Sequence, residues 1–184
     1  SHERYVVATA KIQFEIGQTA LHAQREDLAR PALRNAAETL EPLVRDHPDV
    51  ALYAGLRGAA LATVSSLTAS DGDLERSCAE SREAMAVFAE LVARFPDVPD
   101  HKGNLAQVES ALGVRLALMG RLDEALEVAE HGLLLQEEAL DQAGGSAGHR
   151  RALAQRRAEF ALVLAVADDV ESARELVESA RALE

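Results

Sequence analysis

The stretch LAQVESALGVRLALMGRLDEALEVAEHGLLLQEEAL, residues 105–140, decides the fold. Its large apolar residues recur at steps of three and four, which places them on one stripe of a helix: Leu105, Val108, Leu112, Leu116 and Met119. Gly120 then ends the pattern, and Asp123 and Glu124 put negative charge where the dipole of a following helix favours it. A second apolar stripe follows, made of Leu122, Leu126, Ala129, Leu133 and Leu140. The segment therefore predicts a hairpin of two helices.

Four features of this hairpin recur at a spacing of 48 residues. Three rows are small: Gly17, Ser65, Gly113, Ala161, then Ala29, Ser77, Ala125, Ala173, then Ala36, Ala84, Gly132, Ala180. The fourth row is large and apolar: Ile16, Val64, Leu112, Phe160. Helices approach closely where a side chain is nearly absent, so these rows are typical of stacked hairpins. The composition agrees, because 36 alanines and only six aromatic residues favour closely packed helices over a sheet.

The chain is therefore predicted to be all-α, a single repeat domain over residues 1–184. The units are expected at 1–47, 48–95, 96–143 and 144–184. They are joined at the Pro48 and Pro96–Pro99 segments, where proline stops a helix, and at the glycines near 145. The eight expected helices cover about 2–24, 28–46, 50–70, 73–95, 99–119, 122–142, 148–166 and 169–183. Gly72 and Gly120 are the expected helix stops within hairpins, and Asp168 takes the glycine's place in the fourth unit.

The spacing of small residues in the third unit resembles the tetratricopeptide repeat. Leu112-Gly113, Ala125 and Gly132 match its signature, although the period of 48 exceeds the usual 34 or so. The Gly120–Ala125 segment, together with Phe95–Pro99, is similar to arrays that follow the catalytic domain of some bacterial serine/threonine kinases. This resemblance implies a right-handed α-solenoid of about four hairpins with eight antiparallel helices. It also implies a non-catalytic scaffold that binds proteins.

Arrays of this family often bind peptides along the first helix of each hairpin, and that face can be mapped here. The candidate groove-lining residues are Lys11, Phe14, Gln18, His22, Ala62, Ser66, Gln107, Ser110, Val114, Gln155, Ala158 and Leu162. Only Lys11 among them suits a carboxylate, so the carboxylate-binding mode of the family is not expected. Small and apolar side chains with scattered amides favour an apolar helix or an extended segment as the ligand. The alternative is that these positions merely pack against one another.

The charge balance and apolar runs exclude several partners. Nineteen basic and 31 acidic residues give a net charge of -12, which opposes binding to nucleic acid and anionic lipid. The basic cluster Arg150, Arg151, Arg156 and Arg157 is expected to be a solvated helix face. The longest apolar run, residues 160–167, is too short to cross a bilayer. The single Cys78 fits a reducing compartment, so the prediction is a cytoplasmic protein with no membrane or nucleic-acid partner.

No reactive constellation is recognisable in the sequence. The glycines at 144, 145 and 148 follow a helix and lack the Lys-Ser or Lys-Thr pair of a phosphate loop. His101 and His149 occupy equivalent places in neighbouring units, but no further histidine or cysteine completes a metal shell. We therefore predict that the chain is not an enzyme and has no catalytic residues, metal or cofactor.

The sequence thus predicts a protein-interaction scaffold that forms part of a larger bacterial signalling protein. Two alternatives stay open: a regulatory domain that senses a ligand or peptide, and a self-association module. Apolar residues at both ends, among them Tyr5, Ile12, Val170 and Leu176, favour a homodimer through one end of the array.

Overall fold

The computed structural model describes residues 2–183 and contains only helices and the turns that join them within that range. The helices are α1 (His2–His22), α2 (Glu26–Asp46), α3 (Ala51–Ser70), α4 (Leu74–Arg94), α5 (Pro99–Leu118), α6 (Leu122–Gln142), α7 (Ala147–Val166) and α8 (Val170–Arg181). They fall into two compact units, Ser1–Arg94 and Phe95–Glu184, each of two hairpins. The predicted all-α fold of eight helices is confirmed, and the predicted helix ends lie within a few residues of the observed ones.

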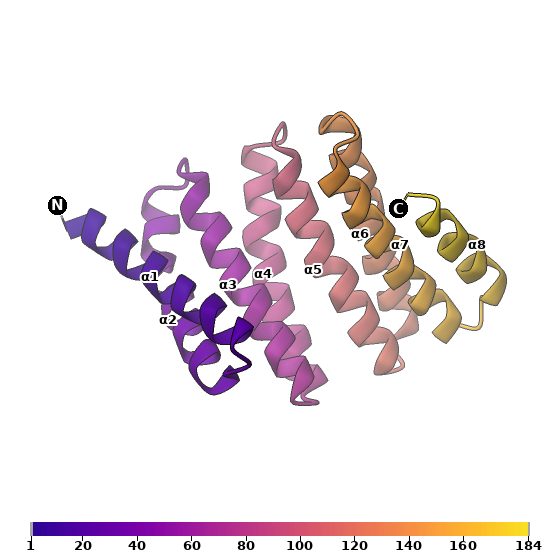
Figure 1. Cartoon of the computed structure of the whole chain (residues 1–184), viewed down its shortest axis with the longest axis horizontal. Helices are drawn as coiled ribbons and strands as arrows, with labels where there is room; N and C mark the ends of the chain where they lie inside the picture. The colour runs from indigo at the N-terminus through magenta and orange to yellow at the C-terminus, as the bar shows by residue number, and fades with distance from the viewer. Residues whose placement is uncertain (1, 184) are drawn as a thin grey trace. The chain divides into compact units, whose positions relative to one another are not determined.

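In the first unit each helix packs against the next one in the chain (Figure 1). Helix α2 lies between α1 and α3, and its apolar stripe forms the centre of a core shared with both neighbours. The buried members of this core are Ala20, Ala29, Leu33, Ala36, Ala37, Ala60, Val64 and Leu67. A second cluster, around Leu40, Leu43 and Tyr53, closes the other end of the same layer.

In the second unit α5 packs against both α6 and α7, and α8 packs against α7. The contact between α5 and α7 brings the first helices of two successive hairpins side by side. Their facing surfaces form the walls of the polar pocket described below. Among residues 2–183, no helix has both the length and the apolar character that crossing a bilayer requires.

The row of small residues marks a close approach of the two helices in the first three hairpins. A Cβ on Gly17 would lie 2.5 Å from Leu33 Cγ, and one on Gly113 would lie 3.1 Å from the Ala125 carbonyl oxygen. In the second hairpin the same place holds Ser65, whose Oγ lies 2.7 Å from Ser81 Oγ. Ser77 Oγ completes this buried cluster by donating to the Ser65 carbonyl at 2.8 Å. The expected pairing of the first helix with the second at these positions is thus observed.

The turns inside the hairpins repeat with the same period. Gly72 and Gly120 have φ of 85° and 78°, a conformation that glycine adopts without strain. Asp168 has a φ of 68°, so it does replace the glycine in the fourth hairpin. The first hairpin uses Gln24, with a φ of 56°, which the sequence pattern did not reveal. All four turns therefore close through one left-handed residue at equivalent positions.

Candidate functional site

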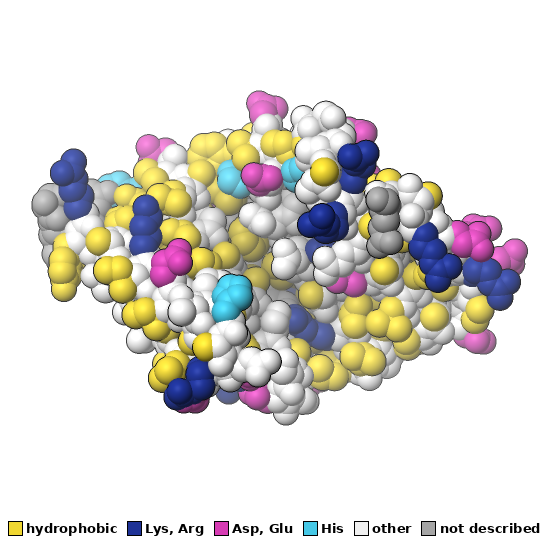
Figure 2. Space-filling view, in the orientation of Figure 1, with side chains coloured by type: hydrophobic (Ala, Val, Ile, Leu, Met, Phe, Trp, Pro, Cys, Tyr) yellow, Lys and Arg dark blue, Asp and Glu magenta, His cyan; other side chains and the backbone are white. Residues whose placement is uncertain are grey.

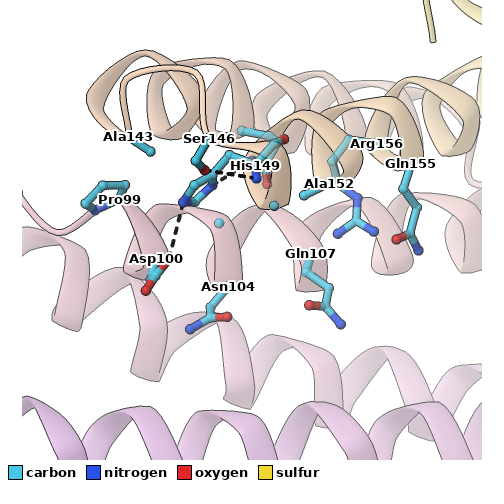
Figure 3. Close-up of a pocket in the computed structure, with 13 residues that line it drawn as sticks. Pro99, Asp100, Asn104, Gln107, Ala143, Ser146, His149, Ala152, Gln155 and Arg156 are labelled. Carbon is cyan, nitrogen blue, oxygen red and sulfur yellow. Dashed lines mark hydrogen bonds and ion pairs between the residues drawn. The ribbon is translucent and has the colours of Figure 1, made fainter. Parts of the chain in front are cut away.

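A polar pocket of about 680 Å³ lies in the second unit, between α5 and α7 (Figure 3). Its walls come from the first turns of both helices, from the end of α6 and from the loop that precedes α7. The lining residues are Pro99, Asp100, Gly103, Asn104, Gln107, Gln136, Ala143, Ser146, Gly148, His149, Ala152, Gln155 and Arg156. We call this pocket the α5–α7 groove.

His149 joins the three helices that surround the groove. Its ring Nε2 lies 3.2 Å from Asp100 Oδ1 on α5, and its Nδ1 lies 3.2 Å from Gln136 Nε2 on α6. Because the amide nitrogen of Gln136 can only donate, Nδ1 is the acceptor in that contact, and Nε2 faces Asp100. The same side-chain amide also reaches the His149 carbonyl at 3.5 Å. These contacts fix the start of α7 against its neighbours.

Gln136 is an unusual wall residue because it is fully buried and polar. Its Nε2 is used by His149, but its Oε1 has no hydrogen-bond partner among the described residues. Leaving a buried carbonyl oxygen unpaired costs about 1 to 3 kcal/mol. A Cβ built on Gly103, another wall residue, would lie 3.6 Å from this oxygen. The groove thus borders an acceptor whose hydrogen-bonding capacity is not used within the described chain.

Arg156 is 3% exposed, so the prediction that this basic cluster is a solvated face is wrong for Arg156. Its guanidinium pairs with Glu159 on the same helix, with Nε 2.9 Å from Oε2 and Nη2 3.2 Å from Oε1. Burial lowers the pKa of Arg156, and the contact with Glu159 opposes that effect. Because a guanidinium carries five N–H donors, this pair leaves donors for the groove.

Three side-chain amides accompany Arg156. Asn104 and Gln107 are three residues apart on α5, which places them on one face of the helix. Gln155 lies opposite them on α7 and donates to Glu159 Oε1 at 3.1 Å. In Figure 3 these amides and the guanidinium of Arg156 extend to the same side of α5 and α7. Both amide groups and guanidinium groups can bond the peptide main chain, which offers N–H donors and C=O acceptors.

Ser146, His149 and Asp100 lie close together, but their contacts do not fit a hydrolytic triad. Ser146 Oγ accepts the main-chain N–H of His149 at 3.4 Å and caps α7. Both ring nitrogens of His149 are engaged, one by Gln136 and the other by Asp100. Neither nitrogen is placed to take a proton from Ser146, as a general base must. Among residues 2–183, no group of three or more histidine, cysteine, aspartate or glutamate side chains is arranged to hold a metal ion.

The structure distributes the twelve sequence-derived groove candidates over several environments. Gln107 and Gln155 line the α5–α7 groove together. In the same unit Ser110 is buried, Val114 is half-buried, and Ala158 and Leu162 are exposed outside the groove. The candidates of the first unit lie in other surroundings. There Lys11 borders an apolar hollow and Phe14 packs against the core. His22 Nδ1 lies 2.8 Å from the main-chain carbonyl oxygen of Gln18, and Ser66 Oγ donates to the main-chain carbonyl of Ala62.

Sequence mapping missed Asp100, Asn104, Gln136, His149 and Arg156 as wall residues of the groove. The mapping assumed that ligand-binding residues lie at the same sequence distances from the small residue of the first helix in every unit. The groove instead lies toward the start of α5 and α7, where these helices and the end of α6 meet. The alignment of Asn104 with Gln107 on one helix face is the signal that was available in the sequence.

The fold and the groove define a helix-hairpin repeat protein with a polar groove between the first helices of two successive hairpins. No protein-family model matches the chain, and a search among curated proteins finds no significant match. Among solved structures, one titled "MamA MSR-1 C2" is 18% identical, with 92% of this chain and 78% of that one covered and a TM-score of 0.41. Another, "Crystal structure of MamA protein", is 16% identical over 93% of each chain, with a TM-score of 0.28. At these sequence identities and TM-scores, the likeness to the two structures supports no conclusion about function.

Proposed function

We propose that this chain is a non-catalytic protein-interaction module that binds an extended peptide segment in the α5–α7 groove. The observation that carries this proposal is the set of amide and guanidinium groups along the groove. Asn104, Gln107 and Gln155 each offer both a donor and an acceptor, which is what the main chain of an extended segment requires. An apolar helix bound in the groove would displace the water that hydrates these groups and would offer them no hydrogen-bond partner.

Charge balance favours main-chain carbonyl groups over carboxylates as the ligands of Arg156. Glu159 lies 2.9 Å from the guanidinium and already balances its charge. The remaining N–H groups are therefore suited to neutral acceptors, which do not bring a second negative charge beside Glu159. Recognition through the main chain tolerates many side chains, as expected of a scaffold with several partners.

Two features of the sequence support a proposal about the larger protein and the class of partner. The similarity of Gly120–Ala125 to kinase-associated arrays supports a role within a larger bacterial signalling protein in the cytoplasm. The net charge of -12 supports protein rather than nucleic-acid partners. A sensing domain differs from this proposal only in that peptide binding would be relayed to another part of the protein.

A peptide-library selection tests the proposal. Random extended peptides selected on the wild-type chain would be retested by isothermal titration calorimetry against Asn104→Ala/Gln107→Ala. We expect the double variant to lose at least about tenfold in affinity, since each lost hydrogen bond is worth about 0.5 to 1.5 kcal/mol. Methylation of the peptide's main-chain nitrogens should weaken binding similarly.

The matched control is Asn35→Ala, which removes an exposed asparagine of α2 in the first unit. It should bind the selected peptides as the wild type does. Peptides that bind the double variant and the wild type equally would overturn the α5–α7 groove as the binding site.

A further inference from the structure

A small hollow of about 250 Å³ lies in the first unit, between the end of α2, the first half of α3 and the second half of α4. Val44, Val87 and Leu91 are among its apolar walls. An ion pair joins α2 to α4 beside it, with Arg34 Nη2 2.9 Å from Glu80 Oε1. We call this cavity the α2–α4 hollow.

Arg57 of α3 brings an unpaired positive charge to the α2–α4 hollow. Its Nε is buried and has no hydrogen-bond partner, and no carboxylate of residues 2–183 forms an ion pair with its guanidinium. The charged side chains over α1 differ, because in Figure 2 they project singly from the surface into solvent. Since a guanidinium carries five N–H donors, Arg57 has donors available for a ligand.

The repeat uses an apolar residue at the position of Arg57 in the second unit. Leu105 and Leu153 stand one and two repeats after Arg57, and they are 5% and 3% exposed. Arginine at this position of α3 therefore replaces a core leucine with a half-buried cation. Buried polar groups without a partner are rare in folded proteins, and a bound ligand is one way to satisfy them.

The other charges around the hollow indicate which ligand Arg57 can receive. Arg94 and Glu90 pair with each other, with Nη2 2.9 Å from Oε1. Glu83 of α4 also lines the hollow and, like Arg57, pairs with no described residue. A ligand with only a carboxylate would be attracted by Arg57 and repelled by Glu83, and a simple amine would meet the reverse. A zwitterion satisfies both unpaired charges.

The size and the walls of the hollow limit the rest of the ligand. At about 30 Å³ for each water-sized atom, its volume of about 250 Å³ holds roughly eight such atoms. Val87 and Leu91 are 8% and 2% exposed, so the wall that they form is apolar and packed into the unit. These properties fit a free amino acid with a branched aliphatic side chain.

We propose that the α2–α4 hollow binds a free branched-chain amino acid. Its carboxylate pairs with Arg57, its ammonium group pairs with Glu83, and its side chain packs against Val87 and Leu91. The proposal is independent of peptide binding in the α5–α7 groove, which lies in the other unit.

Isothermal titration calorimetry of the whole chain with L-leucine and L-valine tests the proposal. We expect at least one of them to bind saturably at one molecule per chain. The derivatives of that amino acid test its two charges: the N-acetyl derivative lacks the ammonium group, and the amino alcohol lacks the carboxylate. Each derivative should bind at least about tenfold more weakly, because each loses a charge-assisted hydrogen bond. Glycine should also bind more weakly, since it has no side chain for the apolar wall.

Two variants assign the binding to the hollow. Arg57→Leu installs the residue that the repeat holds at this position in the second unit, so it should keep the helical circular dichroism and abolish binding. Glu83→Gln removes the charge of an exposed side chain and should weaken binding by at least about tenfold, even if Arg57→Leu unfolds. Glu38→Gln, at an exposed glutamate of α2, is the matched control and should bind as the wild type does.

Three results would overturn the proposal. The first is the absence of saturable binding by either amino acid at millimolar concentration. The second is equal binding of the amino acid and its N-acetyl derivative, or of the amino acid and its amino alcohol, because the site would then recognise only one of the two charges. The third is unchanged affinity in folded Arg57→Leu or in Glu83→Gln, which would place the binding elsewhere.

Discussion

A Cβ atom on Gly113 would lie 2.8 Å from the Cβ of Ala129, closer than two side chains can approach. Helices α5 and α6 therefore meet at a distance that glycine alone permits at this position. The neighbouring main chain is also near, since the Ala125 carbonyl oxygen would be 3.1 Å from the added atom. The close approach of the two helices of a hairpin is the element that the repeat preserves.

Substitution of Gly113 should accordingly disrupt the third hairpin. We expect Gly113→Leu to lower the free energy of unfolding by at least about 1 to 3 kcal/mol, because the helices must separate to hold the side chain. Gly55 on α3 is the matched control, since a Cβ there would meet nothing within 4 Å. Gly55→Ala should stabilise the chain by about 0.5 to 1 kcal/mol through helix propensity. Urea unfolding followed by circular dichroism measures both, and an unchanged midpoint for Gly113→Leu would contradict the packing described.

Substitutions in the large apolar row should cost more unfolding free energy where the side chain is buried than where it is exposed. Leu112 is 1% exposed, so we expect Leu112→Ala to cost about 2 to 5 kcal/mol. Ile16 occupies the equivalent place in the first hairpin but is half exposed, and Ile16→Ala should therefore cost much less in a monomeric sample. Thermal and urea unfolding of both variants would test this difference. Equal losses would show that α1 is covered within a single chain.

Glu109 should make stability depend on pH. Its carboxylate is 5% exposed and lies 2.7 Å from His131 Nδ1; burial raises the pKa of Glu109 above 4.5, and His131 partly opposes this. The folded state therefore holds a proton at a pH where the unfolded chain has lost it. The stabilisation is complete below pH 4.5 and is lost as the pH rises through the folded pKa.

Replacing Glu109 with glutamine removes this titration while preserving the side chain's shape. We expect the difference in unfolding free energy between wild type and Glu109→Gln to shift in favour of the wild type as the pH falls from 7 toward 4.5. Urea unfolding of both proteins across this range provides the measurement. Parallel pH profiles would mean that the buried carboxylate has an ordinary pKa.

Each unit should fold without the other. The first unit has its own core around Leu33 and Val64. Within the second unit, α5 packs against α6 and α7, and α7 packs against α8. We expect a fragment of residues 95–184 to keep the helical circular dichroism per residue of the intact chain and to unfold cooperatively. A random-coil spectrum for this fragment would contradict the division into two units.

The helices could be predicted from the sequence because their ends rest on local chemistry. Gly72 and Gly120 mark turns that need a positive φ, and Pro99 begins α5 where its missing N–H is harmless. Gln24 closes the first hairpin in the same conformation, but a glutamine gives no sign of it. The predicted end of α1 and start of α2 were each two residues late for this reason.

The groove could be predicted only in part because it depends on how helices pack across repeats. The periodicity brought Gln107 and Gln155 into the candidate set. It could not distinguish buried Arg156 from exposed Arg150 and Arg151, since all three belong to one basic cluster. The burial of Arg156 depends on how α7 packs against α5 and α6, which the local charge pattern does not report.

The central claim is that the α5–α7 groove is where this chain binds a peptide. NMR titration of the whole isotope-labelled chain with a selected peptide tests it most directly, because side-chain amide signals report on Asn104, Gln107 and Gln155 individually. We expect these signals and the backbone amides at the start of α5 and α7 to shift together and to saturate at one peptide per chain. Shifts confined to α1 and α2, or none in the groove at saturation, would contradict the claim.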